Sequence, residues 1–256
     1  MVVSILLTAP PVLRVHAEPT SDPGAFVDGI GNCTFGGLGC PWQLLTTSQG
    51  GDVVILAAWC LCSSAAPSVS DDAGLSYALR ASFFAVQSPG PGFPLSLWEY
   101  YATTETDLSS DNITFVNQPG SYPDIFLQAF AIQKGDTESI FDPSSALPDI
   151  VKCPGVNPVH GGYGTCMASV GTFSNDFAFA ITAINDASAC PDPTSDGFTE
   201  LATLGGHLDI DISVVGQSAQ VSFTCKGGNA PGTDPMAMIL DAVSLDGSQS
   251  TDTNYE

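Results

Sequence analysis

Apolar residues along this chain recur in short runs rather than at helical spacing. The runs are rich in β-branched and aromatic side chains and are bounded by Gly, Pro, Asn, Asp and Ser, which is typical of strands joined by turns. Residues 53–59 are apolar throughout, as in a central strand, whereas 95–101 and 208–214 alternate, so we expect one buried and one wet face there. The predicted strands are 53–62, 78–86, 95–102, 112–116, 125–133, 166–172, 176–184, 199–203, 207–215, 220–225 and 236–245.

Five sequence elements of the first half recur in the same order in the second half of the chain. The matched pairs are 51–59 with 175–183, 70–79 with 194–202, 95–100 with 208–213, 112–116 with 219–224, and 124–132 with 235–243. The repeat is longer than a solenoid unit, which spans about 20 to 50 residues. We therefore predict an all-β fold, a large jelly-roll-like β-sandwich built from two repeated five-strand modules and stapled by disulfides.

The repeat also predicts how the chain is divided. An N-terminal extension holds an exchanged strand and the Cys33–Cys40 loop, and a crossing rich in Gly and Pro separates the two modules. The expected boundaries are 1–44 for the extension, 45–148 for the first β module, 149–165 for the crossing, 166–246 for the second β module and 247–256 for a polar tail.

The charge of the chain is lopsided, with 27 acidic residues against 5 basic ones. Nucleic acids and anionic membranes are bound through clustered Lys and Arg, and no two cations here are close in sequence. No apolar stretch reaches the roughly 20 residues that span a bilayer. We therefore expect neither a nucleic-acid partner nor membrane insertion.

The cysteine count of eight is even, and a zinc site would need C-x₂₋₄-C pairs that are absent. Disulfides and an oxidising, extracellular location are the better interpretation. We expect Cys33–Cys40 and Cys153–Cys166 bridges, each closing a loop rich in Gly. Two residues on one strand face would form a strained bond, so we expect the next pair to reach across to the second module: Cys60 and Cys62 with Cys190 and Cys225.

The first module carries turn and strand patterns at 51–57, 68–77, 97–102, 111–115 and 130–148, and the second has a G-F-T-x-L turn at 197–201. Over residues 45 to 245 this arrangement resembles a group of secreted archaeal and phage- or virus-associated tandem β-sandwich surface proteins. The resemblance implies a cell-surface or virion location and brings no catalytic residues with it.

Candidate chemistry is sparse. His16, His160 and His207 lie in no G-x-S-x-G context, so we expect plain histidines and no enzymatic activity. Asp209 and Asp211 share one face of a strand, which suits either a solvated acidic face or a calcium site, and no other cofactor is expected.

Two tripeptides match the acceptor signal for N-glycosylation, at Asn32 and at Asn112. Asn112 follows a turn, where an acceptor is expected. Asn32 precedes a bridged Cys33, which hinders it.

These features favour an extracellular structural protein, the subunit of a surface filament, sheath or virion that polymerises through β-strand contacts. The alternative is a monomeric adhesin or carbohydrate-binding module. An apolar run ahead of the repeat separates them, because it has no counterpart in either module and would complete a neighbour's sheet edge. Its assembly residues are Val2, Val3, Ile5, Leu6 and Leu7. A cleaved leader is the competing interpretation of this run.

Deleting residues 1–9 should yield folded monomers, because the exchanged strand would then be gone. Light scattering and circular dichroism would measure this. Filaments of unchanged width in the truncated protein would show that these residues are not the joint.

Overall fold

The computed structural model describes residues 22–33, 39–60, 62, 65–86, 94–116, 125–153, 165–172, 175–184, 197–216, 219–226 and 236–246. Residues 1–21, with the predicted assembly strand, lie outside this set. One 3₁₀ helix, η1 (Pro23–Phe26), precedes the strands. The strands are β1 (Val27–Ile30), β2 (Trp42–Leu45), β3 (Val53–Cys60), β4 (Ser68–Ser70), β5 (Ala78–Val86), β6 (Pro94–Thr103), β7 (Asp111–Val116), β8 (Ile125–Ile132), β9 (Asp149–Cys153), β10 (Thr165–Thr172), β11 (Asp176–Ile184), β12 (Thr199–Leu204), β13 (Leu208–Val215), β14 (Ala219–Lys226) and β15 (Met236–Ser244).

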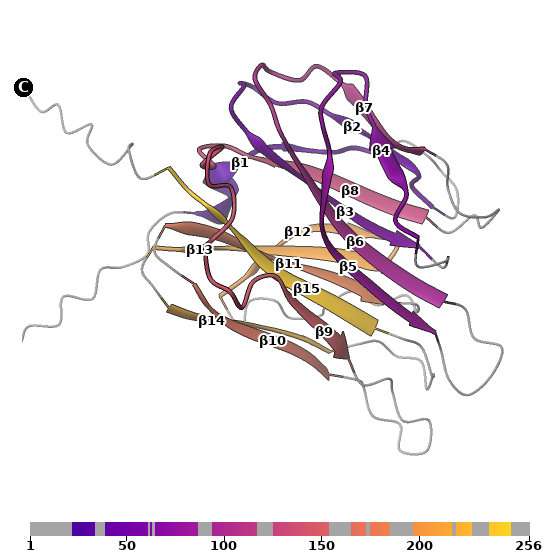
Figure 1. The fold of residues 1–256 in the computed structure, drawn as a ribbon, viewed down its shortest axis with the longest axis vertical. Helices are drawn as coiled ribbons and strands as arrows, with labels where there is room; N and C mark the ends of the chain where they lie inside the picture. The colour runs from indigo at the N-terminus through magenta and orange to yellow at the C-terminus, as the bar shows by residue number, and fades with distance from the viewer. Residues whose placement is uncertain are drawn as a thin grey trace, which may run out of the picture.

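The described strands form four stacked antiparallel layers (Figure 1). Two five-stranded sheets, β1-β8-β3-β6-β5 and β12-β13-β11-β15-β9, lie in the middle and share an inner core of apolar side chains. The sheet β2-β7-β4 covers the outer face of the first, and the pair β10-β14 covers the outer face of the second. The central strands of both large sheets are therefore buried on both faces. The predicted all-β class is confirmed.

The two halves have the same pattern of connections. In the first, β1 pairs with β8, β2 with β7 and β3 with β6; in the second, β9 pairs with β15, β10 with β14 and β11 with β13. Such nested pairing of a chain folded back on itself over two sheets is jelly-roll topology. The described strands number eight in the first half and seven in the second, rather than five in each.

The expected boundaries need correction. β1 and β2 fall in the predicted extension 1–44 or across its end, yet they pair with β8 and β7 of the first half. β9 falls in the predicted crossing 149–165, yet it pairs with β15. The observed connection is residues 133–148, and part of it runs along β15 through bridges from Gly135 to Leu245 and from Phe141 to Val243. Gly135 lies so close to Val53 that a Cβ atom there would meet its Cγ2 at 2.6 Å.

The disulfides differ in part from expectation. Cys33 and Cys40 are bonded, as predicted. Cys60 bonds to Cys62, with 5.3 Å between their Cα atoms, so the predicted bridges from this pair to the second module are wrong. β3 ends at Cys60, so Cys62 lies beyond the strand, where the chain can turn back.

The remaining cysteines are only partly described. Cys166 and Cys225 are buried and disulfide-bonded. The side chain of Cys153, and all of Cys190, lie outside the described residues, so the predicted Cys153–Cys166 bridge stays a prediction.

One ion pair joins the two halves across the inner core. Arg80 of β5 donates from Nε to Asp241 of β15 at 2.8 Å, and its guanidinium lies 4.0 Å from the ring centre of Phe141. The neighbouring Glu99 of β6 is fully buried beside Asp241. Burial raises the pKa of Glu99 well above its usual range, and the charge of Asp241 raises it further. Glu99 therefore holds a proton while Asp241 pairs with Arg80.

Replacing Arg80 by Ala should lower the free energy of unfolding by about 3–5 kcal/mol, because Asp241 would be left charged and buried without a partner. Glu99→Gln is the matched control and should cost under about 1 kcal/mol, since it replaces a neutral acid by a neutral amide. Urea denaturation followed by fluorescence measures both. Equal losses in the two variants would contradict this account of the ion pair.

Candidate functional site

Every large apolar side chain that is exposed in the described residues lies on a strand at the edge of its sheet. An edge strand presents unpaired backbone groups that can pair with another chain. Elsewhere in the strands, the large apolar side chains that the structure describes are buried or half-buried. The exposed residues are Ile30 on β1, Leu79 and Phe84 on β5, Ile150 on β9 and Met167 on β10.

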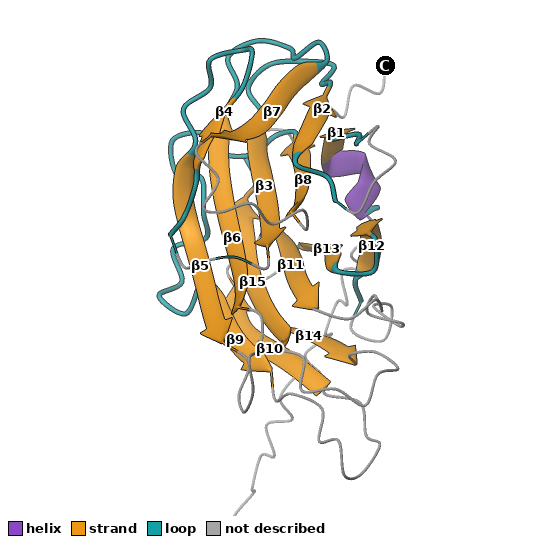
Figure 2. Cartoon of the chain, turned by 90° about the vertical axis from the view of Figure 1, so that its right-hand side faces the viewer, coloured by secondary structure: helices purple, strands orange, loops and turns teal. Residues whose placement is uncertain are grey.

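Three of these five residues gather on one side of the molecule. β5 and β9 are the edges of the two large sheets on the same side of the stack, as Figure 2 shows. We call this the β5–β9 side, defined by Leu79, Phe84 and Ile150. A register shift between Leu79 and Ala81 interrupts the start of β5, and the pairing with β6 is regular from Ala81 onwards. The regular part of the edge therefore carries Phe84.

The opposite side is built differently. β1 and β12 are the edges there, and β1 has only 4 residues. β12 exposes Thr199, Glu200 and Thr203. Charged residues and short strands are common means of keeping sheet edges from pairing with other chains. Ile30 on β1 is the one exposed large apolar residue described on this side, against three on the β5–β9 side.

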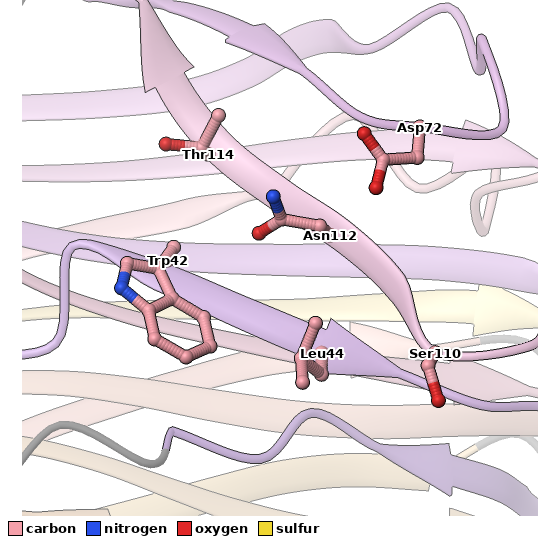
Figure 3. A pocket seen from close by; sticks show the side chains of 6 residues that line it. All are labelled: Trp42, Leu44, Asp72, Ser110, Asn112 and Thr114. Atoms are coloured by element: carbon pink, nitrogen blue, oxygen red, sulfur yellow. The ribbon is translucent and has the colours of Figure 1, made fainter.

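A surface hollow of about 420 Å³ lies on the outer face of the sheet β2-β7-β4 (Figure 3). β2 contributes Trp42 and Leu44, and β7 contributes Asn112 and Thr114. Asp72 and Ser110 complete the lining. An aromatic ring beside an amide, hydroxyls and a carboxylate suits a polar ligand with an apolar face, such as a sugar.

Each half buries an aspartate at the start of its central strand. Asp52 precedes β3, and Asp176 opens β11 at the matching place. Burial, followed by the nearby Asp28, raises the pKa of Asp52 to about 7. Burial, followed by the nearby Asp142, raises the pKa of Asp176 to about 8. Each half thus buries an aspartate whose pKa lies near neutral pH, beside a second carboxyl group.

The strand face carrying Asp209 and Asp211 is buried, so the expectation of a wet face on β13 is wrong. Asp209 accepts a hydrogen bond from Thr203 Oγ1 at 2.5 Å. Burial, then the charges of Asp209 and Glu200, raise the pKa of Asp211 to about 8. No group of three or more His, Cys, Asp or Glu side chains in the described residues is arranged to hold a metal ion. Calcium binding at this pair stays a prediction.

The alternating strand β6 is likewise buried on both faces, because Ser96 and Glu99 are fully covered. The central strands of a sheet that has a second layer on each side have no wet face.

The histidines are also only partly described. His207 is half-buried beside β13, and its ring stacks on Trp59 with 5.1 Å between centres, so it is not a plain surface histidine. His16 and His160 lie outside the described residues. Asn32 and Asn112, the two glycosylation acceptors, are on the surface, with Asn112 in the hollow.

No family model, characterised protein or solved structure matches this chain. None of the helices in the described ranges has the length and apolar character needed to cross a membrane. The candidate functional features are therefore the β5–β9 side and the hollow, both of which come from the geometry itself.

The buried aspartates predict that the protein is less stable at high pH. An unfolded Asp has a pKa of about 3.9. The folded-state pKa values of Asp52 and Asp176 are higher, so their stabilisation is complete below about pH 4 and is lost as the pH rises through about 7 and about 8. Urea midpoints measured from about pH 5 to 9 should fall, and the double variant Asp52→Asn/Asp176→Asn should flatten the curve.

The control for this prediction is Glu105→Gln/Asp107→Asn, which removes two exposed acids and the same formal charge. Its curve should keep the slope of the wild type. Equal flattening in both double variants would attribute the pH dependence to net charge instead of the buried pairs.

Proposed function

We propose that this chain is an extracellular structural subunit of a surface filament, sheath or virion, and that it assembles with further copies of itself through strand edges. The observation that carries the proposal is the concentration of exposed apolar side chains on edge strands, above all on the β5–β9 side. Pairing a second chain there would satisfy open backbone groups and bury these side chains together.

Two further features support an extracellular role. Four cysteines form the Cys33–Cys40 and Cys60–Cys62 disulfides, and such bonds persist in oxidising compartments. The formal net charge of −22 keeps isolated subunits apart and soluble until a specific contact forms. Salt weakens this repulsion, so assembly should be favoured as ionic strength rises.

The alternative function, a monomeric adhesin or carbohydrate-binding module, is supported by one observation, the hollow beside Trp42. The edge strands favour assembly over this alternative, because a monomer gains nothing from apolar residues on open edges. Enzymatic activity is not part of the proposal.

Replacing Leu79 and Phe84 by Lys should abolish assembly. Lysine on an edge strand opposes pairing, and the variant also loses two side chains whose burial stabilises a contact by about 1.5–3 kcal/mol each. The association constant should fall about 100-fold or more. Analytical ultracentrifugation and negative-stain imaging would measure this, with circular dichroism to verify the fold.

The matched control is Thr137→Lys/Ser139→Lys, which adds the same charge in an exposed loop. It should assemble like the wild type. The assembly proposal fails if the wild type is monomeric at all concentrations and salt levels, and the choice of side fails if the β5 variant still forms the same polymers.

A further inference from the structure

We propose that Asn112 carries an N-linked glycan. The first sugars of this glycan occupy the hollow on the sheet β2-β7-β4 and pack against the indole of Trp42. This proposal does not depend on assembly, because a monomer could carry the glycan equally well.

The register of the sheet brings the necessary groups together. β2 and β7 are antiparallel, and Trp42 lies opposite Thr114 while Leu44 lies opposite Asn112. Directly opposed side chains have Cβ atoms about 5 Å apart, and diagonal neighbours are about 7–8 Å apart. Trp42 is therefore diagonal to Asn112 on the same face, at a distance that a sugar ring attached to the amide can bridge. Figure 3 shows the side chains of both strands on the same open face.

The two residues that define the acceptor signal, Asn112 and Thr114, lie on one face of β7. Ile113, between Asn112 and Thr114, is fully buried and points into the core beneath. Asn112 and Thr114 alternate with it, so the amide and the hydroxyl both face the hollow and both are partly exposed. The Asn112 amide makes no hydrogen bond to another described residue. Its nitrogen, to which the sugar would be attached, is therefore not held by a hydrogen bond in this part of the chain.

The other acceptor signal lacks this setting. Asn32 is exposed and exchanges both backbone hydrogen bonds with Leu44. It lies beside Cys33, which is bonded to Cys40, and it is not among the residues that line the hollow. Asn112 therefore has both the acceptor sequence and a hollow that can hold the first sugars.

The modification is a group transfer from an activated sugar. The donor class is an oligosaccharide joined through C1 to a lipid phosphate or pyrophosphate, used by a transferase of the producing cell. The bond from Asn112 Nδ2 to C1 forms as the C1–O bond to the donor phosphate breaks. The phosphate leaves with the bonding electron pair, and one amide proton passes to a base. The sugar's C–H face can then cover the indole of Trp42 while its hydroxyls meet Ser110 and Asp72.

The test uses protein purified from the organism that makes it. Glycopeptide mass spectrometry should find a glycan on the peptide containing Asn112. Thr114→Ser should keep it, because the hydroxyl remains, and Thr114→Val should lose it although the side chain has nearly the same shape. Asn32→Gln is the matched control and should leave the glycan on Asn112 unchanged.

The packing of the glycan on Trp42 is tested by a separate measurement. Trp42→Ala should leave occupancy of Asn112 unchanged but let an amidase release the glycan about tenfold faster, since stacking no longer shields the linkage. An unmodified Asn112 in the native protein overturns the proposal. If such protein instead binds free oligosaccharides and loses them in Trp42→Ala, the hollow is a saccharide-binding site and the proposal is equally overturned.

Discussion

Covering both faces of the two five-stranded sheets takes every side chain on their central strands out of water, whether it is polar or apolar. Apolar residues meet this constraint by packing. Polar ones meet it by giving up charge or by pairing, which is why Asp52, Asp176 and Asp211 have raised pKa values. Arg80 and Asp241 instead keep their charges and pair between the halves. The four-layer stack therefore determines the protonation of the core as well as its packing.

Likeness between the halves makes their differences informative. The edge strand β5 exposes Leu79 and Phe84, whereas its counterpart β12 exposes Glu200 and Thr203. Two topologically equivalent edges thus differ in surface chemistry, with exposed apolar side chains on β5 and exposed polar or charged ones on β12. The hollow adds a further asymmetry, because it lies on the outer layer of the first half, facing away from the inner core.

The long strands could be predicted from the sequence because burial leaves runs of β-branched and aromatic residues, as in residues 53–60. The short strands β1, β2, β4 and β9 have 3 to 5 residues, too few for alternation to be recognised. Alternation in β6 and β13 predicted a wet face on each strand. This prediction was wrong because the alternation within a strand does not show whether a second layer covers its polar face. The Cys60–Cys62 bond and the stacking of His207 on Trp59 depend on where the chain turns and on contacts distant in sequence.

The connection through residues 133–148 has a consequence for how the protein behaves on dilution. The two jelly rolls of the protein contact each other through their large sheets, much as the subunits of a dimer would. Subunits of a true dimer separate when diluted, because their association depends on concentration. Here the partner is tethered by a short segment held along β15, so its effective concentration is fixed by the chain. The inner core therefore stays closed at any dilution, even when a single molecule has drifted far from all others.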